Sequence, residues 1–160
     1  MTSQRLTFPL AGGCSCGAIR YEIADWPLAL YTCNCTNCQR ASGSTFAMNM
    51  PIATKDFPIT PSEPKGWHHV SPSGAKVTSR FCSDCGSRLC GEREGRPEVV
   101  NLRAGTLDDT SWLVPAAHIY MRSAQPWIQP AKDAVCFETQ PAPAEFRAAL
   151  GAWSARIGDE

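Results

Sequence analysis

The sequence has no long hydrophobic run and no excess of charge of either sign. Its 15 Lys and Arg residues balance its 15 Asp and Glu residues, so it has neither the basic excess of a nucleic-acid-binding protein nor an acidic tail. The most apolar stretches, WPLALY and WLVPAA, contain proline and are far shorter than the roughly 18 residues of a membrane-spanning helix. We therefore expect neither a nucleic acid nor a membrane as a partner.

Other common features are missing as well. The beginning of the chain, MTSQRLTFPLAGG, lacks the uninterrupted apolar centre of a signal peptide. We therefore expect a cytoplasmic protein, whose cysteine thiols stay reduced. No Ser-His-Asp signature, phosphate loop or dinucleotide fingerprint is visible. The length of 160 residues suits one domain with its own core.

Cysteine, by contrast, is abundant, with nine residues. Seven of them form three short motifs: C-x-C at Cys14 and Cys16, C-x-C-x-x-C at Cys33, Cys35 and Cys38, and C-x-x-C at Cys82 and Cys85. In a reducing compartment, clustered cysteines indicate metal ligation before disulfides.

The seven cysteines divide most economically into four and three. The C-x-C and the distant C-x-x-C can complete a closed tetrahedral zinc site, which stabilises a fold directly. The remaining three cysteines would then hold a zinc with an open fourth position, the pattern of a catalytic zinc. A competing division joins Cys35/Cys38 with Cys82/Cys85 as a zinc ribbon, but it leaves three cysteines without a role.

Period-two alternation of apolar residues predicts strands over residues 18–23, 44–50 and 76–81, and two more segments, 98–107 and 117–123, are also strand candidates. Residues 51–74 contain five prolines and are predicted to form a loop or an irregular excursion with room for one short strand. In the tail, Phe146, Leu150, Trp153 and Ile157 recur at helical spacing. The pattern predicts a mainly antiparallel β fold with a C-terminal helix.

Three strings carry a resemblance to a known family: GGCSCGAIRYEI, CNCTNCQRASGSTFAM and SRFCSDCGSRL. In order and spacing they resemble the glutathione-dependent formaldehyde-activating enzyme (GFA) family, which includes the centromere protein V domain. The resemblance extends to AHIYMRSAQPW and covers about residues 11–130. It implies an Mss4-like (β-tent) fold and two zinc ions per chain. It also implies a structural zinc at Cys14, Cys16, Cys82 and Cys85, and a catalytic zinc at Cys33, Cys35 and Cys38.

We accordingly expect an N-terminal segment over 1–10, a zinc-binding β domain over 11–135, and a helical tail over 136–160 packed on the same domain. The resemblance implies a carbon–sulfur lyase that joins a small thiol, such as glutathione, to a small aldehyde, as in S-(hydroxymethyl)glutathione synthase. A zinc held by three thiolates is a weaker Lewis acid than one held by histidines, so a soft thiol ligand suits it. The alternative is a non-catalytic, zinc-stabilised protein-binding module. A homodimer is compatible with the sequence.

Substrate contacts are expected from the residues that follow the trio. Arg40 is the best candidate to bind a carboxylate, and Ser42 and Ser44 offer hydrogen bonds close to the site. Arg80 and Arg88, which flank the second C-x-x-C, are expected to be solvated or structural.

The remaining polar and aromatic candidates receive less specific expectations. His68 and His69 are expected to be exposed loop residues, and His118 either lines the pocket or is a hydrogen-bonded structural histidine. Trp127 is expected to pack at the edge of the core. We expect Cys90 and Cys136 to be small buried hydrophobic residues rather than ligands. No general base can be nominated.

Overall fold

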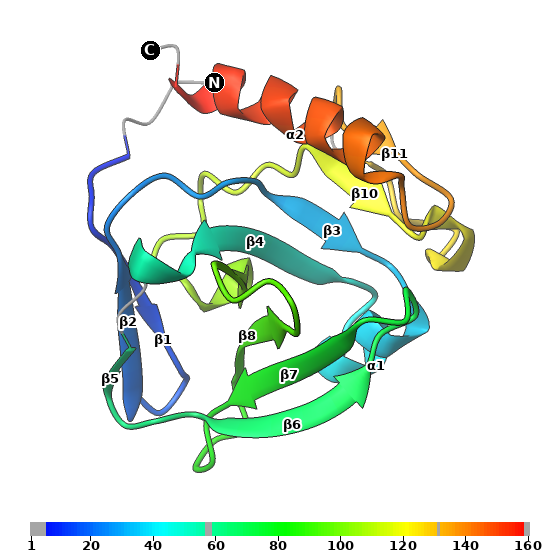
Figure 1. Ribbon diagram of the computed structural model, residues 1–160. Helices are drawn as coiled ribbons and strands as arrows, with labels where there is room; N and C mark the ends of the chain where they lie inside the picture. Colours follow the sequence, from blue (N-terminus) through cyan, green and yellow to red (C-terminus); the bar gives the residue numbers. More distant parts are fainter. Residues whose placement is uncertain (1–5, 57–58, 131, 159–160) are drawn as a thin grey trace.

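The computed structural model describes residues 6–56, 59–130 and 132–158, in which eleven strands and two α-helices form (Figure 1). The strands are β1 (Leu10–Gly13), β2 (Ile19–Ile23), β3 (Tyr31–Cys33), β4 (Ala47–Ala53), β5 (Ile59–Pro61), β6 (Lys65–Val70), β7 (Lys76–Phe81), β8 (Arg88–Arg93), β9 (Val99–Arg103), β10 (Ala117–Ile119) and β11 (Val135–Cys136). The helices are α1 (Thr36–Ser42) and α2 (Pro143–Gly158), with 3₁₀ turns η1 (Thr54–Asp56), η2 (Ala104–Thr106) and η3 (Met121–Ser123). The predicted mainly β fold with a C-terminal helix is confirmed.

The smaller of two sheets has the strand order β1-β2-β5, with antiparallel pairing throughout. In β2 the alternation read from the sequence buries Ile19, Tyr21 and Ile23 and leaves Glu22 exposed. The Tyr21 hydroxyl lies 2.7 Å from Oγ1 of Thr106 in η2, which satisfies a polar group at the edge of the core.

The larger sheet has the order β11-β10-β3-β4-β9-β8-β7-β6. Its pairs are antiparallel except that β10 runs parallel to both β3 and β11, so the antiparallel expectation holds for most of the sheet. One face contributes Met50, Ile52, Leu89 and Leu102 to the main core, where they meet the buried residues of β2. This burial of two apolar sheet faces against each other stabilises the fold.

Strand register fixes what the other face of the large sheet carries. Cys33 lies opposite Ala47, and Asn49, two residues further along β4, lies opposite Arg103. Because side chains alternate along a strand and paired residues share a face, Cys33, Asn49 and Arg103 lie on the same side of the sheet. This face positions the candidate site described below.

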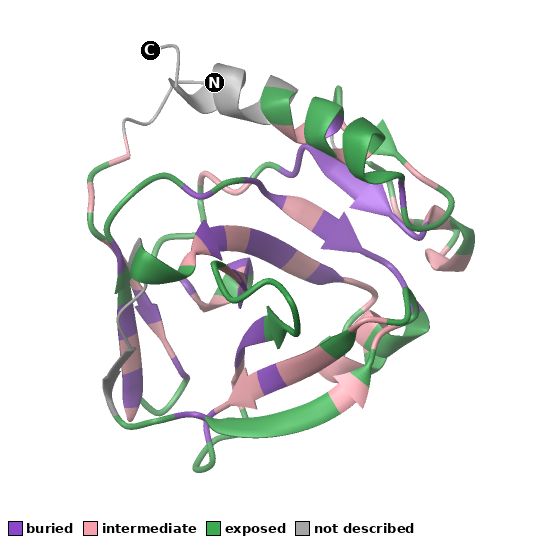
Figure 2. Cartoon of the chain, viewed as in Figure 1, coloured by how far each residue is buried: buried purple, intermediate pink, exposed green. Residues whose placement is uncertain are grey.

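The segment 51–74 differs from the expected irregular loop. β4 extends into it as far as Ala53, and both β5 and β6 lie within it. β6 is an edge strand that is exposed along nearly its whole length, as Figure 2 shows. An edge strand of this kind has no buried face to impose alternation on its sequence, which explains why the pattern did not predict it.

The expected C-terminal helix is present as α2, which lies beside the β10 and β3 side of the large sheet in Figure 1. Phe146 packs edge-on against Tyr31, with ring centroids 5.0 Å apart. Phe146 and Phe137 also contact a second buried cluster formed by Cys33, Cys35, Ile119 and Tyr120.

Several expectations reach beyond the described residues. The side chains of Trp153 and Ile157 and residues 1–5 of the N-terminal segment lie outside that part of the chain. Across the part that is described, no helix combines the length and the apolar character needed to cross a bilayer.

Candidate metal centres

The four cysteines of the first and last motifs converge between the two sheets. Cys14 and Cys16 come from the β1–β2 turn, Cys82 and Cys85 from the β7–β8 turn, and all four Sγ atoms lie within 4.8 Å of one another. The Sγ–Sγ distance is 3.5 Å for Cys14–Cys16 and 3.7 Å for Cys16–Cys82. A tetrahedral zinc with bonds of about 2.3 Å would separate its sulfurs by about 3.8 Å. The cluster therefore fits a closed zinc site.

Two glycine-containing turns shape this cluster. Gly17 and Gly86 follow the two motifs with φ of 79° and 76°, a region that costs glycine little. The backbone N–H of Ile19 donates to Cys14 Sγ at 3.2 Å, a contact that favours a thiolate. At the other turn, hydrogen bonds from Ser87 lower the pKa of Cys85 to about 5. Hydrogen bonds thus favour the thiolate at two of the four cysteines, Cys14 and Cys85.

The second cluster consists of Cys33, Cys35 and Cys38, whose Sγ atoms also lie within 4.8 Å of one another. Cys33 ends β3, Cys35 is the N-cap of α1, and Cys38 lies in the first turn of that helix. The Cys35 sulfur accepts the N–H of Cys38 at 3.4 Å, so the cap of the helix is itself a candidate ligand. Among the described residues, no fourth His, Cys, Asp or Glu side chain joins the group.

The three thiols of this trio influence one another's ionisation. Hydrogen bonds from Cys33 and Cys38 lower the pKa of Cys35 to about 2. The pKa of Cys33 is raised, first by its hydrogen bond to Cys35 and then by that to Cys38 and by burial. One thiolate is therefore favoured at the expense of its neighbours, and three can coexist only if a cation neutralises them. The donor set fits Zn²⁺, which prefers thiolates.

The side chain of Gln39 anchors helix α1 to two neighbouring segments of the chain. The Gln39 side-chain amide donates to the carbonyl of Asn34 at 2.7 Å and to that of Ser123 in η3 at 2.8 Å. Gly43, with φ of 62°, ends the helix. These bonds fix α1 relative to both β3 and the chain after β10, which preorganises the trio.

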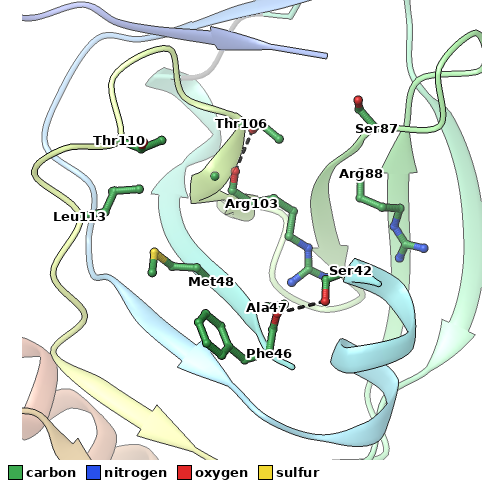
Figure 3. A pocket seen from close by; sticks show the side chains of 11 residues that line it. Ser42, Phe46, Ala47, Met48, Ser87, Arg88, Arg103, Thr106, Thr110 and Leu113 are labelled. Atoms are coloured by element: carbon green, nitrogen blue, oxygen red, sulfur yellow. Dashed lines mark hydrogen bonds between the residues drawn. The ribbon is translucent and has the colours of Figure 1, made fainter. Parts of the chain in front are cut away.

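A cavity of about 590 Å³ lies close to the segments that carry the trio, and Figure 3 shows the side chains that line it. Part of its wall is Ala47, which pairs with Cys33, and Ser42, whose Oγ donates to the Cys38 carbonyl at 2.9 Å. The cysteines themselves are not in the lining. Arg88 and Arg103 also line the cavity, at the start of β8 and the end of β9, and in Figure 3 the Arg103 side chain extends toward Ser42.

Residues 9–123, more than half of the chain, match the family described as glutathione-dependent formaldehyde-activating enzyme. The chain belongs to the GFA family. A crystal structure of a Rhodobacter sphaeroides protein shares the fold at 20% sequence identity, with a TM-score of 0.50 over 64% of this chain and 92% of that chain. No curated protein sequence matches the chain.

The predicted division of cysteines in this GFA-family chain agrees with the geometry. The four-cysteine and three-cysteine groups form separately, and the described structure does not join Cys35 and Cys38 to Cys82 and Cys85 as a zinc ribbon. Both groups are compatible with zinc. Their roles as structural and catalytic sites belong to the proposal below.

The three predicted substrate contacts lie at different places. Ser42 lines the cavity. Arg40 is exposed in the last turn of α1, and Ser44 is exposed beyond it; neither belongs to the cavity wall. Arg103 was missed, since it lies 65 or more residues from the trio in sequence and only strand pairing brings it near.

The other arginines and the histidines mostly have structural partners. Arg80 pairs with Glu92 at 2.8 Å, as expected of a structural residue, whereas Arg88 faces the cavity. His68 and His69 lie on β6 rather than in a loop. The ring of His69 stacks on Trp67 with centroids 4.4 Å apart.

His118 is a buried structural histidine. Its Nδ1 lies 2.7 Å from the hydroxyl of Thr32, and burial lowers its pKa. Cys90 is buried, as expected, and burial raises its pKa to about 12. The expectations for Cys136 and Trp127 were wrong, because Cys136 is exposed on the edge strand β11 and Trp127 is 66% exposed. Neither residue belongs to a stretch with periodic apolar residues, so the sequence contained no signal for its exposure.

Proposed function

We propose that the chain is a zinc-dependent carbon–sulfur lyase that forms and cleaves a thiol–aldehyde adduct, similar to S-(hydroxymethyl)glutathione synthase. The observation that carries the proposal is the trio, whose three thiols converge without a fourth protein ligand in the described residues. A zinc ion bound there would supply one open position that binds a substrate thiol and favours its thiolate form. Membership of the GFA family supports glutathione as the thiol and formaldehyde as the aldehyde.

In the addition, the thiol sulfur forms a bond to the aldehyde carbon, and the thiol proton ends on the former carbonyl oxygen. No oxidant or reductant is needed, and the reverse reaction breaks the same C–S bond. The uncatalysed addition is already feasible, so the protein would act mainly by supplying and orienting the thiolate. The anchored helix α1 supports this role, since Gln39 holds it at two carbonyls.

The two cysteine clusters would have different roles. Cys33, Cys35 and Cys38 would hold the catalytic zinc, and Ser42 lies on the cavity wall where it could contact substrate. Arg40 and Ser44 remain candidate contacts, although both are exposed and neither lines the cavity. The other four cysteines would hold a structural zinc, because a closed four-thiolate site leaves no position for substrate. Reduced thiols are required throughout, which favours the cytoplasm.

The test combines metal counting with a reaction assay. Protein with two zinc ions per chain should accelerate the exchange between free formaldehyde and S-hydroxymethylglutathione, followed by NMR exchange spectroscopy. Cys35→Ser keeps an oxygen that can cap α1 but removes a thiolate, so it should retain the fold, lose one zinc and lose the acceleration. Cys136→Ser, which alters an exposed cysteine outside both clusters, is the matched control and should behave like the wild type.

The same test can favour the alternative function, a non-catalytic protein-binding module. If fully loaded protein gave no acceleration with any small thiol, and its metal spectrum stayed unchanged during thiol titration, the enzymatic proposal would be wrong. Retained acceleration in Cys35→Ser would equally exclude the trio as the reaction site.

A further inference from the structure

The cavity beside the trio is lined by two arginines, Arg88 and Arg103, that form no ion pair with a carboxylate of the described residues. In the described part of the chain, Arg20, Arg80 and Arg96 each form an ion pair with an acidic residue. Arg88 and Arg103 do not, although both line the cavity. Since a half-buried guanidinium without an anionic partner is unfavourable, an external anion is the natural ligand for the pair.

Arg103 is held so that most of its donors remain available. It donates to Oδ1 of Asn49, and the Asn49 amide group donates in turn to the Ala47 carbonyl at 3.2 Å, which sets the orientation of the amide. Asn49 is 5% exposed, so this support is fixed within the sheet. A guanidinium has five N–H donors, and a single one is used here within the described residues.

Arg88 faces the same space from the neighbouring strand. Its guanidinium carbon lies 5.8 Å from the centre of the Trp67 ring, which is itself stacked on His69. Its Nε is buried and has no hydrogen-bond partner among the described residues. The aromatic contact orients the side chain without satisfying its donors, so Arg88 also retains capacity for an oxygen ligand.

The trio and the two arginines act on one another electrostatically. Burial lowers the pKa of Arg88, the charge of Arg103 lowers it further, and Cys38 acts in the opposite direction. Three thiolates around one Zn²⁺ leave a net charge of about −1, which would repel an anionic substrate. Two nearby guanidiniums reverse that repulsion.

Resting on the proposed function, we propose that Arg88 and Arg103 bind a carboxylate of the thiol substrate and thereby select anionic over neutral thiols. The two side chains are specificity-determining residues, and they take over the role that the sequence suggested for Arg40. A carboxylate between them accepts charge-assisted hydrogen bonds while the substrate sulfur points toward the trio.

The experiment measures binding of small thiols to the zinc-loaded full-length protein by isothermal titration calorimetry. The probes are 3-mercaptopropionate, 2-mercaptoethanol and cysteamine, which have similar size and carry negative, neutral and positive charge. The wild type should bind 3-mercaptopropionate most tightly and lose that preference as salt is raised. Arg103→Gln and Arg88→Gln should each weaken the binding of 3-mercaptopropionate by about tenfold or more. The affinity for 2-mercaptoethanol should change by no more than about twofold.

Matched controls separate cavity charge from overall charge. Arg80→Gln removes an ion-paired arginine near the same turn and should leave the preference unchanged. Arg40→Gln tests the alternative contact on α1, and loss of the preference in that variant would count against Arg88 and Arg103. Arg103→Lys keeps the positive charge but not the planar guanidinium group. It should therefore retain part of the preference for 3-mercaptopropionate that Arg103→Gln loses. Should Arg103→Gln fail to fold, Arg88→Gln and the salt dependence of the wild type still decide the question.

S-methylglutathione, which has carboxylates but no thiol, distinguishes the two proposals. If S-methylglutathione binds to the wild type and binds more weakly to Arg88→Gln or Arg103→Gln, the two arginines recognise a carboxylate. This result would hold even if no thiol binds to the metal. Thiol binding that is indifferent to probe charge, or that depends on Arg40 instead, would overturn the assignment and leave the proposed function intact.

Discussion

Substitution of Phe146 by alanine tests whether the C-terminal helix protects the trio. Phe146 is half-buried, contacts the cluster that contains Cys33 and Cys35, and packs edge-on against Tyr31. Removing a fully buried Phe side chain costs about 3–5 kcal/mol, so a half-buried one should cost about 2 kcal/mol. The aromatic pair accounts for about 0.5–1.5 kcal/mol of this loss. Undocking of α2 should then become about 30-fold more frequent, at about 1.4 kcal/mol per factor of ten.

The assay follows metal release to an excess of a coloured chelator. If undocking of α2 exposes the trio, the phase that corresponds to the three-cysteine site should accelerate by up to that factor in Phe146→Ala, while the four-cysteine phase stays unchanged. Phe146→Leu keeps most of the apolar contact and should show a smaller effect. A lower melting temperature in Phe146→Ala without any change in metal release would refute the reasoning, because docking would then matter for stability alone.

Three further outcomes are expected. Cys82→Ser should reduce bound zinc from two ions to one and destabilise the fold by at least about 3 kcal/mol in chemical denaturation, since zinc binding contributes about 10–16 kcal/mol in small zinc domains; Cys136→Ser should change stability by about 0.5 kcal/mol or less. Burial lowers the pKa of His118, so below about pH 6.5 the unfolded chain binds more protons than the folded chain. The free energy of unfolding should therefore fall with decreasing pH more steeply in the wild type than in His118→Asn. Urea unfolding at several pH values measures this difference. Gly12→Ala would place a Cβ 2.6 Å from the Thr106 carbonyl oxygen and should lower stability in thermal unfolding by about 1–3 kcal/mol, whereas Gly105→Ala meets nothing within 4 Å and should be nearly neutral.

The parts of the fold with one buried face were predictable from the sequence. Ile19, Tyr21 and Ile23 alternate because one face of β2 packs on the core, and that alternation marked the strand. β6 could not be recognised, since both of its faces are largely exposed. Helix α1 was also missed, because the cysteine spacing drew attention to ligation; Gly43 directly after Ser42 is the C-cap that could have indicated a short helix.

For the candidate site, the spacing of the cysteines could be read from the sequence, whereas the residues that line the cavity could not be predicted. Motif spacing predicted both cysteine groups, because the cysteines within each motif are separated by only one or two residues. Arg103 reaches the trio only through the order β3-β4-β9, a long-range pairing that no local pattern encodes. Arg40 was favoured as the carboxylate contact because it is close in sequence, but it lies on the exposed side of α1, and its role remains a prediction.

The turn from Phe81 to Arg88 links the two centres mechanically. Cys82 and Cys85 lie in this turn close to Cys14 and Cys16 of the smaller sheet, and six residues after Cys82 the chain enters β8 with Arg88, which lines the cavity. If the four cysteines hold zinc, its exchange for a larger soft ion such as cadmium would lengthen the metal–sulfur bonds and shift the start of β8. If Arg88 binds substrate as proposed, a metal ion that contacts no substrate would thereby alter which thiols bind.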